Sequence, residues 1–521
     1  MIKNFKWLLL VSLTFVACND DEDVVTYDSS DGLPLTAGTA DFTKYVSLGN
    51  SLTAGYTDSA LFIQGQNDSY PNILASQFAL VGGGEFKIPF VSDNTGGLLL
   101  GGFQAAGPRL YFNGTGPTPV TSPITTEITN FLTGSFNNMG VPGAKSFHLL
   151  SNSYGNVAGV GTFANPYFVR FASSPSATVV GDAVAQNPTF FSLWIGNNDV
   201  LSYATSGGIG VNQIGNLNPA TYGGNDITDP TAFASVYSSI VTNLTAGGAK
   251  GVVANIPYVT SVPFFTTVPT NPIPGLSPTQ ATSLNQLFGG INLALAGAGL
   301  PSRFATIVSD DGNPATIENN PLLILDESLP NISAQITAAL TTPVGPYPAG
   351  TAAFIGGLYG RARHARNTTG NKDYILLTSR GIIGTTQSGV PATFSTIGVT
   401  YPMQDGAVLT AAETAEVKTA TDAYNASILS IATTNSLAFV DANAALNQVA
   451  NGGITVNNYT LTSNYVTGGA FSLDGVHPCP RGYALIANKF IEAINAKYGS
   501  NLKGVNVGKY RILYPQNPTL F

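Results

Sequence analysis

The stretch FTKYVSLGNSLTAGY, which spans residues 42–56, decides the fold. Residues 42–48 are rich in aromatic and β-branched side chains, which favour a β-strand. Gly49 and Asn50 then end this strand, because both residue types are typical of turns. Ser51 follows directly, so the sequence places a hydroxyl group at the point where a strand gives way to a turn.

Strands and helices alternate along the rest of the chain. Four more strands are predicted: a short one ahead of Asn138, and then residues 189–195, 251–256 and 437–441. One helix is predicted to start at Asp229, with Pro230 at the first helical position. A second starts at a capping box of Thr410 and Glu413 and runs through about Ala432. A third follows Pro480. This alternation predicts an α/β fold in which helices cover both faces of a parallel sheet.

The predicted organisation has one folded domain, with two segments before it and a tail after it. Residues 57–130 and about 262–400 fit the alternation poorly and are rich in Gly, Pro, Thr and Asn, so we interpret them as insertions over the loop edge of the sheet. The full division is a signal peptide at 1–17, an acidic linker at 18–38, the α/β domain at 39–500 and a C-terminal tail at 501–521.

The N-terminus has the features of an export signal. Lys3 and Lys6 precede an apolar run at residues 7–17, which is too short to span a bilayer as a helix. The run ends at Cys18 and resembles a bacterial lipobox, which implies a lipid on this cysteine and an outer-membrane lipoprotein that faces the periplasm or the cell surface. The acidic residues 19–23 look like surface-export signals of Bacteroidetes lipoproteins. An ordinary signal peptide and a simple solvated tether are the alternatives.

Composition narrows the class of protein. Charged residues make up only 10% of the chain and the net charge is −8, so no basic surface for nucleic acid is expected. The chain has two cysteines, and acylation of Cys18 would leave Cys479 without a partner. We therefore expect a fold that is held by its hydrophobic core and not by disulfides. We also expect a monomer.

Polar segments follow the predicted strands, where ligands bind in open parallel sheets. They are residues 49–56, 138–144 and 196–199, with a further segment at 474–477 near the C-terminus. A serine needs a base to take its proton, and the chain has three histidines. His148 lies in an apolar stretch and His364 among arginines, whereas His477 follows Asp474 by three residues. His477 is therefore the predicted base.

These four segments, in this order, resemble the SGNH/GDSL hydrolase family. The resemblance implies a three-layer, flavodoxin-like α/β/α fold with a central parallel sheet, into which the large insertions are set. It also implies that Ser51 is the nucleophile, His477 the base and Asp474 its orienting partner. The oxyanion hole would comprise the Ser51 N–H, the Gly143 N–H and the Asn198 side chain. The sequence departs from the family at residue 50, where Asn replaces Asp.

The implied activity is hydrolysis of a small-molecule or lipid ester through an acyl-enzyme, with no cofactor and no metal. A carbohydrate deacetylase and a non-catalytic surface binding protein are the alternatives. Ser51 as a helix N-cap and Asn198 in an Asx turn are the local alternatives. We expect the insertions to supply an apolar cleft through Leu98–Leu100, Leu110–Phe112 and Phe264-Phe265. Asp310–Asn313 could suggest calcium, although a solvated turn is favoured.

Overall fold

A computed structural model of the protein describes residues 32–313, 315–341 and 347–520. Its central sheet has five parallel strands in the order β17-β8-β7-β1-β6. The strands are β1 (Tyr45–Gly49), β6 (Asn138–Gly140), β7 (Phe190–Trp194), β8 (Lys250–Ala254) and β17 (Ala438–Val440). The predicted α/β class with a central parallel sheet is therefore confirmed. The predicted signal peptide and Cys18 lie outside the described residues.

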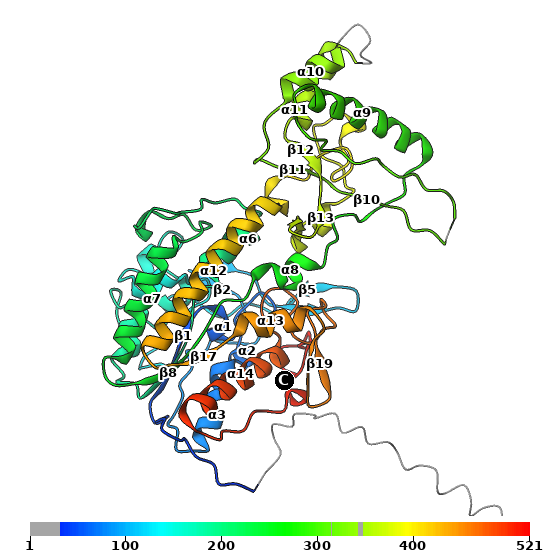
Figure 1. The fold of residues 1–521 in the computed structure, drawn as a ribbon. Coiled ribbons are helices and arrows are strands. Elements are labelled where there is room, and N and C mark those ends of the chain that lie inside the picture. The colour runs from blue at the N-terminus through cyan, green and yellow to red at the C-terminus, as the bar shows by residue number, and fades with distance from the viewer. Residues whose placement is uncertain (1–31, 314, 342–346, 521) are drawn as a thin grey trace, which may run out of the picture.

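Helices cover both faces of the sheet (Figure 1). Side chains alternate across a strand, so Val46 and Leu193 enter one apolar core while Phe190 and Trp194 enter another on the opposite face. The first core is completed by α5 (Val179–Val184), α6 (Asn198–Thr205), α7 (Pro230–Thr245) and α12 (Ala411–Thr434). The second is completed by α3 (Tyr70–Ala79), α13 (Ala442–Ala450) and α14 (Pro480–Tyr498).

The predicted helix starts are confirmed. The Asp229 carboxylate accepts hydrogen bonds from the N–H groups of Thr231 and Ala232, at 2.8 and 2.9 Å, and Pro230 is the first residue of α7. Thr410 and Glu413 form the capping box of α12, and Pro480 opens α14. Each of these signals is local, because the donors that a cap satisfies lie within one turn of the capping residue.

One strand prediction is wrong in position. The edge strand consists of residues 138–140 themselves and not of the residues ahead of them. Asn138 is buried there, and both ends of its amide have partners: the nitrogen donates to the Thr53 carbonyl at 3.0 Å and the oxygen accepts from the Gly140 N–H at 3.0 Å. A buried asparagine in a strand requires such partners from elsewhere in the fold, which the local sequence does not reveal.

The loop edge of the sheet carries short elements. Those of the N-terminal half are α1 (Ser51–Ala54), α2 (Ile63–Asn67), α4 (Pro166–Val169) and two hairpins, β2 (Leu98–Leu100) with β3 (Phe103–Ala106) and β4 (Leu110–Phe112) with β5 (Pro117–Pro119). Further along the chain lie α8 (Pro263–Thr266) and the hairpin of β18 (Ile454–Val456) with β19 (Tyr459–Leu461). Leu98 is buried against Ile128 and Val169, so it packs in a small core of its own.

A lobe stands away from the sheet (Figure 1). Its helices are α9 (Pro278–Gly297), α10 (Ser333–Thr341) and α11 (Ala349–Tyr359). Its short strands are β9 (Ile273–Pro274), β10 (Asn319–Asn320), β11 (Leu323–Leu325), β12 (Ala362–His364), β13 (Asn367–Thr368) and β14 (Asn371–Lys372). The pair of β15 (Tyr374–Ile375) and β16 (Val408–Leu409) lies at the junction, because Leu409 packs in a core of the sheet. The three helices bury an apolar core separate from the two cores of the sheet, with Phe288 and Ile355 inside it. The second predicted insertion thus holds long helices, which its composition concealed.

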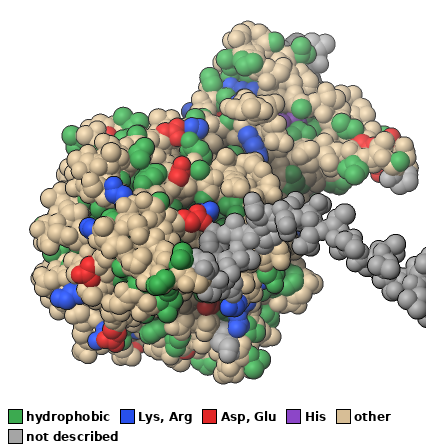
Figure 2. Space-filling model, turned by 60° about the horizontal axis from the view of Figure 1, so that its bottom comes forward, with side chains coloured by type: hydrophobic (Ala, Val, Ile, Leu, Met, Phe, Trp, Pro, Cys, Tyr) green, Lys and Arg blue, Asp and Glu red, His purple; other side chains and the backbone are tan. Residues whose placement is uncertain are grey.

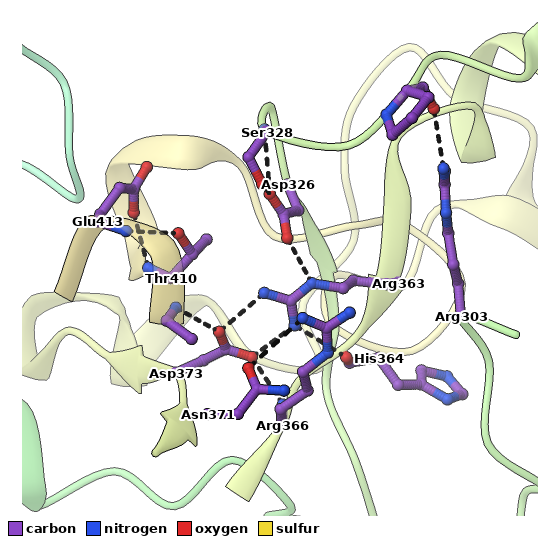
Figure 3. A network of polar contacts seen from close by, with 12 residues as sticks. Arg303, Asp326, Ser328, Arg363, His364, Arg366, Asn371, Asp373, Thr410 and Glu413 are labelled. Carbon is purple, nitrogen blue, oxygen red and sulfur yellow. Dashed lines mark hydrogen bonds and ion pairs between the residues drawn. The ribbon is translucent and has the colours of Figure 1, made fainter. Parts of the chain in front are cut away.

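A buried ion network joins this lobe to α12 (Figure 3). Arg363 on β12 lies between two carboxylates, with its Nε 2.5 Å from Asp326 and its Nη1 2.5 Å from Asp373. Asp373 also accepts the Ala411 N–H at the start of α12, at 2.9 Å. Because these groups are almost fully buried, the loss of one partner would leave an uncompensated charge. The network therefore fixes where the lobe joins α12.

The surface agrees with the low charge of the sequence. On the face shown in Figure 2, charged side chains are scattered among uncharged ones. Among the described residues, no helix is both long enough and apolar enough to cross a membrane.

Candidate active site

Three side chains that are distant in the sequence form a hydrogen-bonded chain. Ser51 is the first residue of α1, directly after β1, and its Oγ lies 2.9 Å from His477 Nε2. The other ring nitrogen of His477, Nδ1, lies 3.0 Å from Asp474 Oδ2. The structure thus brings together the predicted nucleophile, base and orienting carboxylate, although 426 residues separate the serine from the histidine.

A tight turn holds Asp474 and His477 in this geometry. Asp474 Oδ1 accepts the N–H groups of Val476 and His477, each at 2.8 Å, which leaves Oδ2 for the imidazole. Burial would raise the pKa of Asp474, but the charge of His477 and these hydrogen bonds lower it to about 2. Gly475 has a φ of +73° within this turn, in the region that favours glycine. The carboxylate is therefore ionised at neutral pH and fixed in direction.

The other two histidines have structural partners. His148 Nδ1 accepts the Lys145 N–H at 3.1 Å, and His364 Nδ1 accepts the Ala305 N–H at 2.8 Å. Burial lowers the pKa of both to about 4, with a further contribution from Lys145 for His148. For His364, which lies among arginines in the sequence, burial is the cause of the lowered pKa.

The predicted oxyanion donors lie at the ends of neighbouring strands. Ser51 occupies the first helical position of α1, where a backbone N–H has no acceptor within the helix. Gly143 follows β6 with a φ of +81° and is exposed. The Asn198 amide, at the start of α6, donates one hydrogen to the Ala144 carbonyl at 2.9 Å. An asparagine amide has two hydrogens, so the second stays available to a ligand.

Asp199 connects the segment after β6, which contains Gly143, to the start of α6, which contains Asn198. Its buried carboxylate accepts hydrogen bonds from the N–H and the Oγ of Ser146, both at 2.8 Å. Burial raises the pKa of Asp199. Because Ser146 follows Gly143 by three residues and Asp199 follows Asn198, this contact sets the position of one predicted donor against the other.

Asn50, the residue that departs from the family pattern, connects two of the predicted segments. Its side chain accepts the Leu52 N–H at 3.0 Å and donates to Asn197 Oδ1 at 3.2 Å. Asn50 is therefore the N-cap of α1, so the alternative that Ser51 is the cap is wrong. An aspartate at this position would have no N–H to donate to the Asn197 oxygen.

Sequence reasoning missed the support that residues 57–59 give to the turn of Asp474 and His477. Asp58 Oδ1 accepts the Leu473 N–H at 2.8 Å, and the Ser59 N–H donates to Asp474 Oδ2 at 3.0 Å. Both Asp58 and Ser59 adopt a positive φ, which is uncommon for residues other than glycine. Thr57 adds a hydrogen bond from its Oγ1 to the Pro478 carbonyl at 3.0 Å. The segment that follows the predicted nucleophile thus holds the turn of its base.

A second support comes from α8. The Phe264 N–H donates to the Gly475 carbonyl at 2.9 Å, while the side chains of Phe264 and Phe265 are buried in the core of the sheet. These two aromatic residues were predicted to line the apolar cleft, but they pack in the core because α8 places them beneath the turn.

Asp58 predicts a pH dependence of stability. Burial raises the pKa of its carboxyl to about 7, so the folded protein keeps a proton that the unfolded chain releases near pH 4. The contribution of Asp58 to the free energy of unfolding is then greatest below about pH 4 and declines as the pH rises to 7, by at most about 1.4 kcal/mol per unit. Asp58→Asn keeps an acceptor oxygen but cannot titrate. Denaturant unfolding between pH 4 and 8 should show that the variant lacks this decline, whereas parallel profiles would contradict the assignment.

One group of carboxylates could approach a metal ion. Oxygen atoms of Asp310, Asp311 and Glu318 lie within 4.8 Å of one another. Asp310 and Asp311 are exposed, and each accepts the N–H two residues further along the turn, at 2.7 Å. These contacts agree with the solvated turn that the sequence favoured. The remaining cysteine is also inert, because burial raises the pKa of the Cys479 thiol to about 12.

The site therefore contains a serine hydroxyl, an imidazole and an ionised carboxylate in one chain of hydrogen bonds, at the carboxyl end of a parallel sheet. Comparisons of the sequence with protein-family models and with curated proteins, and of the structure with solved structures, find no match. The function is accordingly argued from these contacts alone.

Proposed function

We propose that the protein is a serine hydrolase that cleaves carboxylic esters through an acyl-enzyme, with the fold and the site of the SGNH/GDSL family. The observation that carries the proposal is the pair of contacts at His477, 2.9 Å to Ser51 Oγ and 3.0 Å to Asp474 Oδ2. A serine needs an adjacent base, and that base needs an orienting group. The binding-protein alternative has no use for this arrangement.

The reaction would proceed in two steps. Nε2 of His477 takes the proton of Ser51 as Oγ bonds to the ester carbonyl carbon, and the N–H groups of Ser51 and Gly143 and the Asn198 amide receive the oxyanion. His477 then gives its proton to the departing alkoxide, which leaves as the alcohol. In the second step His477 takes a proton from water, which attacks the acyl-enzyme, and the returned proton releases Ser51 with a carboxylic acid as product. Each oxyanion donor would supply about 3 kcal/mol in the transition state.

The expected result of a chemical test is covalent labelling of Ser51. A fluorophosphonate probe requires an activated serine, so it should label the full chain at this residue, as identified by peptide mass spectrometry. The labelled protein should lose its hydrolysis of p-nitrophenyl esters. Labelling at another serine would contradict the proposal. A steep preference for acetate release from acetylated polysaccharides over these esters would instead favour the deacetylase alternative.

The proposed setting of this enzyme is the outer membrane. A lipid on Cys18 would hold the domain at the surface through the linker at residues 18–38, close to any lipid ester. This anchor and the monomeric state stay predictions.

A further inference from the structure

An apolar pocket extends from the site into the space between α13 and α14. It has a volume of about 130 Å³, and Ser51, Asn198 and His477 border it at one end. Trp194 and Val440, the last residues of β7 and β17, also line it. The pocket is therefore continuous with the predicted nucleophile and reaches beyond it along the edge of the sheet.

Two helix faces form the walls of this pocket. On α13 they comprise Ala442, Ala445, Leu446 and Val449, and on α14 Gly482, Leu485, Ile486, Lys489 and Phe490. Both sets follow the spacing of one helix face, at intervals of three and four residues. α13 and α14 lie on the same side of the molecule in Figure 1. The walls thus come from the α/β core, and not from the insertions that were expected to supply an apolar cleft.

We propose that this pocket binds the acyl chain of the ester, with the ester carbonyl at Ser51. The inference rests on the proposed function. Polar side chains stand at the reactive end, whereas Trp194, Val440 and Leu485 further along offer an acyl chain only apolar contact. A sugar or glycerol group placed there would lose hydrogen bonds to water without replacement, which is costly. An alkyl chain would gain about 0.8 kcal/mol per buried methylene, which is about a fourfold change in binding.

The length of the pocket sets a chain length. From Gly482 to Phe490 the wall of α14 covers nine residues, whose eight rises of about 1.5 Å add up to about 12 Å. With C–C bonds of about 1.5 Å, an extended chain of about ten carbons covers that distance. Lys489 also lines the pocket, and it pairs with Glu492 at 2.9 Å. We therefore expect kcat/KM to rise about fourfold per methylene from acetyl toward decanoyl esters and then to level off.

The test compares two adjacent alanines on α13. Ala445 lines the pocket, whereas Ala444 is exposed, so Ala445→Phe should obstruct the chain and Ala444→Phe should not. Exclusion of three methylenes lowers kcat/KM for p-nitrophenyl decanoate by about 60-fold. Hydrolysis of p-nitrophenyl acetate should stay within about twofold of wild type in Ala444→Phe, and in Ala445→Phe it should fall far less than hydrolysis of the decanoate. An equal loss on both esters, or no loss on the decanoate, would overturn the inference.

Two measurements on the unmodified protein complete the test. Straight-chain fatty acids should inhibit acetate-ester hydrolysis competitively, with inhibition constants that fall about fourfold per methylene up to decanoate. Decyl acetate, which carries the long chain on the alcohol, should not share the advantage of a decanoyl ester. If acetyl esters are hydrolysed but kcat/KM does not change with the length of the acyl chain, the inference that the pocket binds this chain is overturned, while the proposed function stands. A higher kcat/KM for decyl acetate would have the same meaning. No hydrolysis of any ester and no labelling of Ser51 would overturn the proposed function, and the pocket's role with it.

Discussion

Ser51→Ala should lower kcat for ester hydrolysis by at least about 10⁴-fold, because no other group in the site can form the acyl-enzyme. The imidazole and the oxyanion donors would remain, so a residual rate above that of water is expected. KM should change little, since the hydroxyl contributes to the transition state more than to binding. Kinetics with p-nitrophenyl butyrate, together with loss of fluorophosphonate labelling, measures this effect.

The variant should fold as the wild type does. Ser51 is the first residue of α1, where alanine is well tolerated, and the cap of this helix is supplied by Asn50. A matched control is Ser202→Ala on α6, whose hydroxyl contacts the Asn198 carbonyl at 3.5 Å. The control should keep both activity and labelling. Full activity of Ser51→Ala, with an unchanged melting temperature, would remove Ser51 from the mechanism.

Local signals account for the parts of the fold that the sequence predicted well. Asp229 and the pair of Thr410 and Glu413 satisfy donors within their own first turn, so their meaning does not depend on the rest of the chain. The same holds for the order of the polar segments after the strands, because the carboxyl ends of parallel strands meet at one edge. That geometry predicted a common edge for Ser51, Gly143 and Asn198, whereas the pairing of Ser51 with His477 was predicted from the choice among three histidines and from the family resemblance.

The lobe was missed although it carries a signal of the same kind. Ser277 and Gln280 form a capping box at the start of α9, and Pro278 occupies its first position. The surrounding sequence is rich in Gly, Thr and Asn, which favours loops, so the region was interpreted as an insertion despite this capping box. The core of the lobe depends on contacts between α9, α10 and α11, and tertiary contacts of this kind override local preference.

Sequence reasoning could not predict the contacts that support the turn of Asp474 and His477. The reason differs from the one that applies to the lobe. Asp58 reaches Leu473 across 415 residues, and its role depends on a backbone conformation that the sequence does not state. The apolar pocket likewise depends on how α13 and α14 face each other, while each helix alone presents an ordinary apolar stripe. Such features arise only once distant segments are placed together.

Asp474→Asn should lower kcat by about 10⁴-fold while the fold is preserved. The asparagine oxygen can still accept the N–H groups of Val476 and His477, so the turn should form, although the amide nitrogen cannot accept the Ser59 N–H that Oδ2 accepts. Its amide nitrogen, however, would face His477 Nδ1 with a donor in place of an acceptor. The imidazole would then carry its proton on Nε2, toward Ser51, and could not act as the base.

The pH dependence of this loss identifies its cause. The pKa of Asp474 is lowered to about 2, so the carboxylate is ionised throughout the range in which esterases are assayed. The titration of Asp474 itself should therefore add no pH dependence to the ratio of wild-type to variant kcat between pH 6 and 8. A folded pKa below the unfolded value also means that Asp474 stabilises the protein above about pH 4 and that this stability is lost as the pH falls toward 2. The variant should lack that acid-sensitive part in denaturant unfolding below pH 4.

The matched control is Asp422→Asn, which removes an exposed carboxylate that pairs with Lys418 on α12. Exposed pairs of this kind contribute little, so the control should keep its activity and most of its stability. A loss in Asp474→Asn that is smaller than tenfold would mean that His477 holds its tautomer without the carboxylate. A loss that vanishes at high pH would instead show that Asp474 acts only through the charge of a protonated imidazole. A constant and large loss is expected, because the direction of the Nδ1 hydrogen bond is what the asparagine removes.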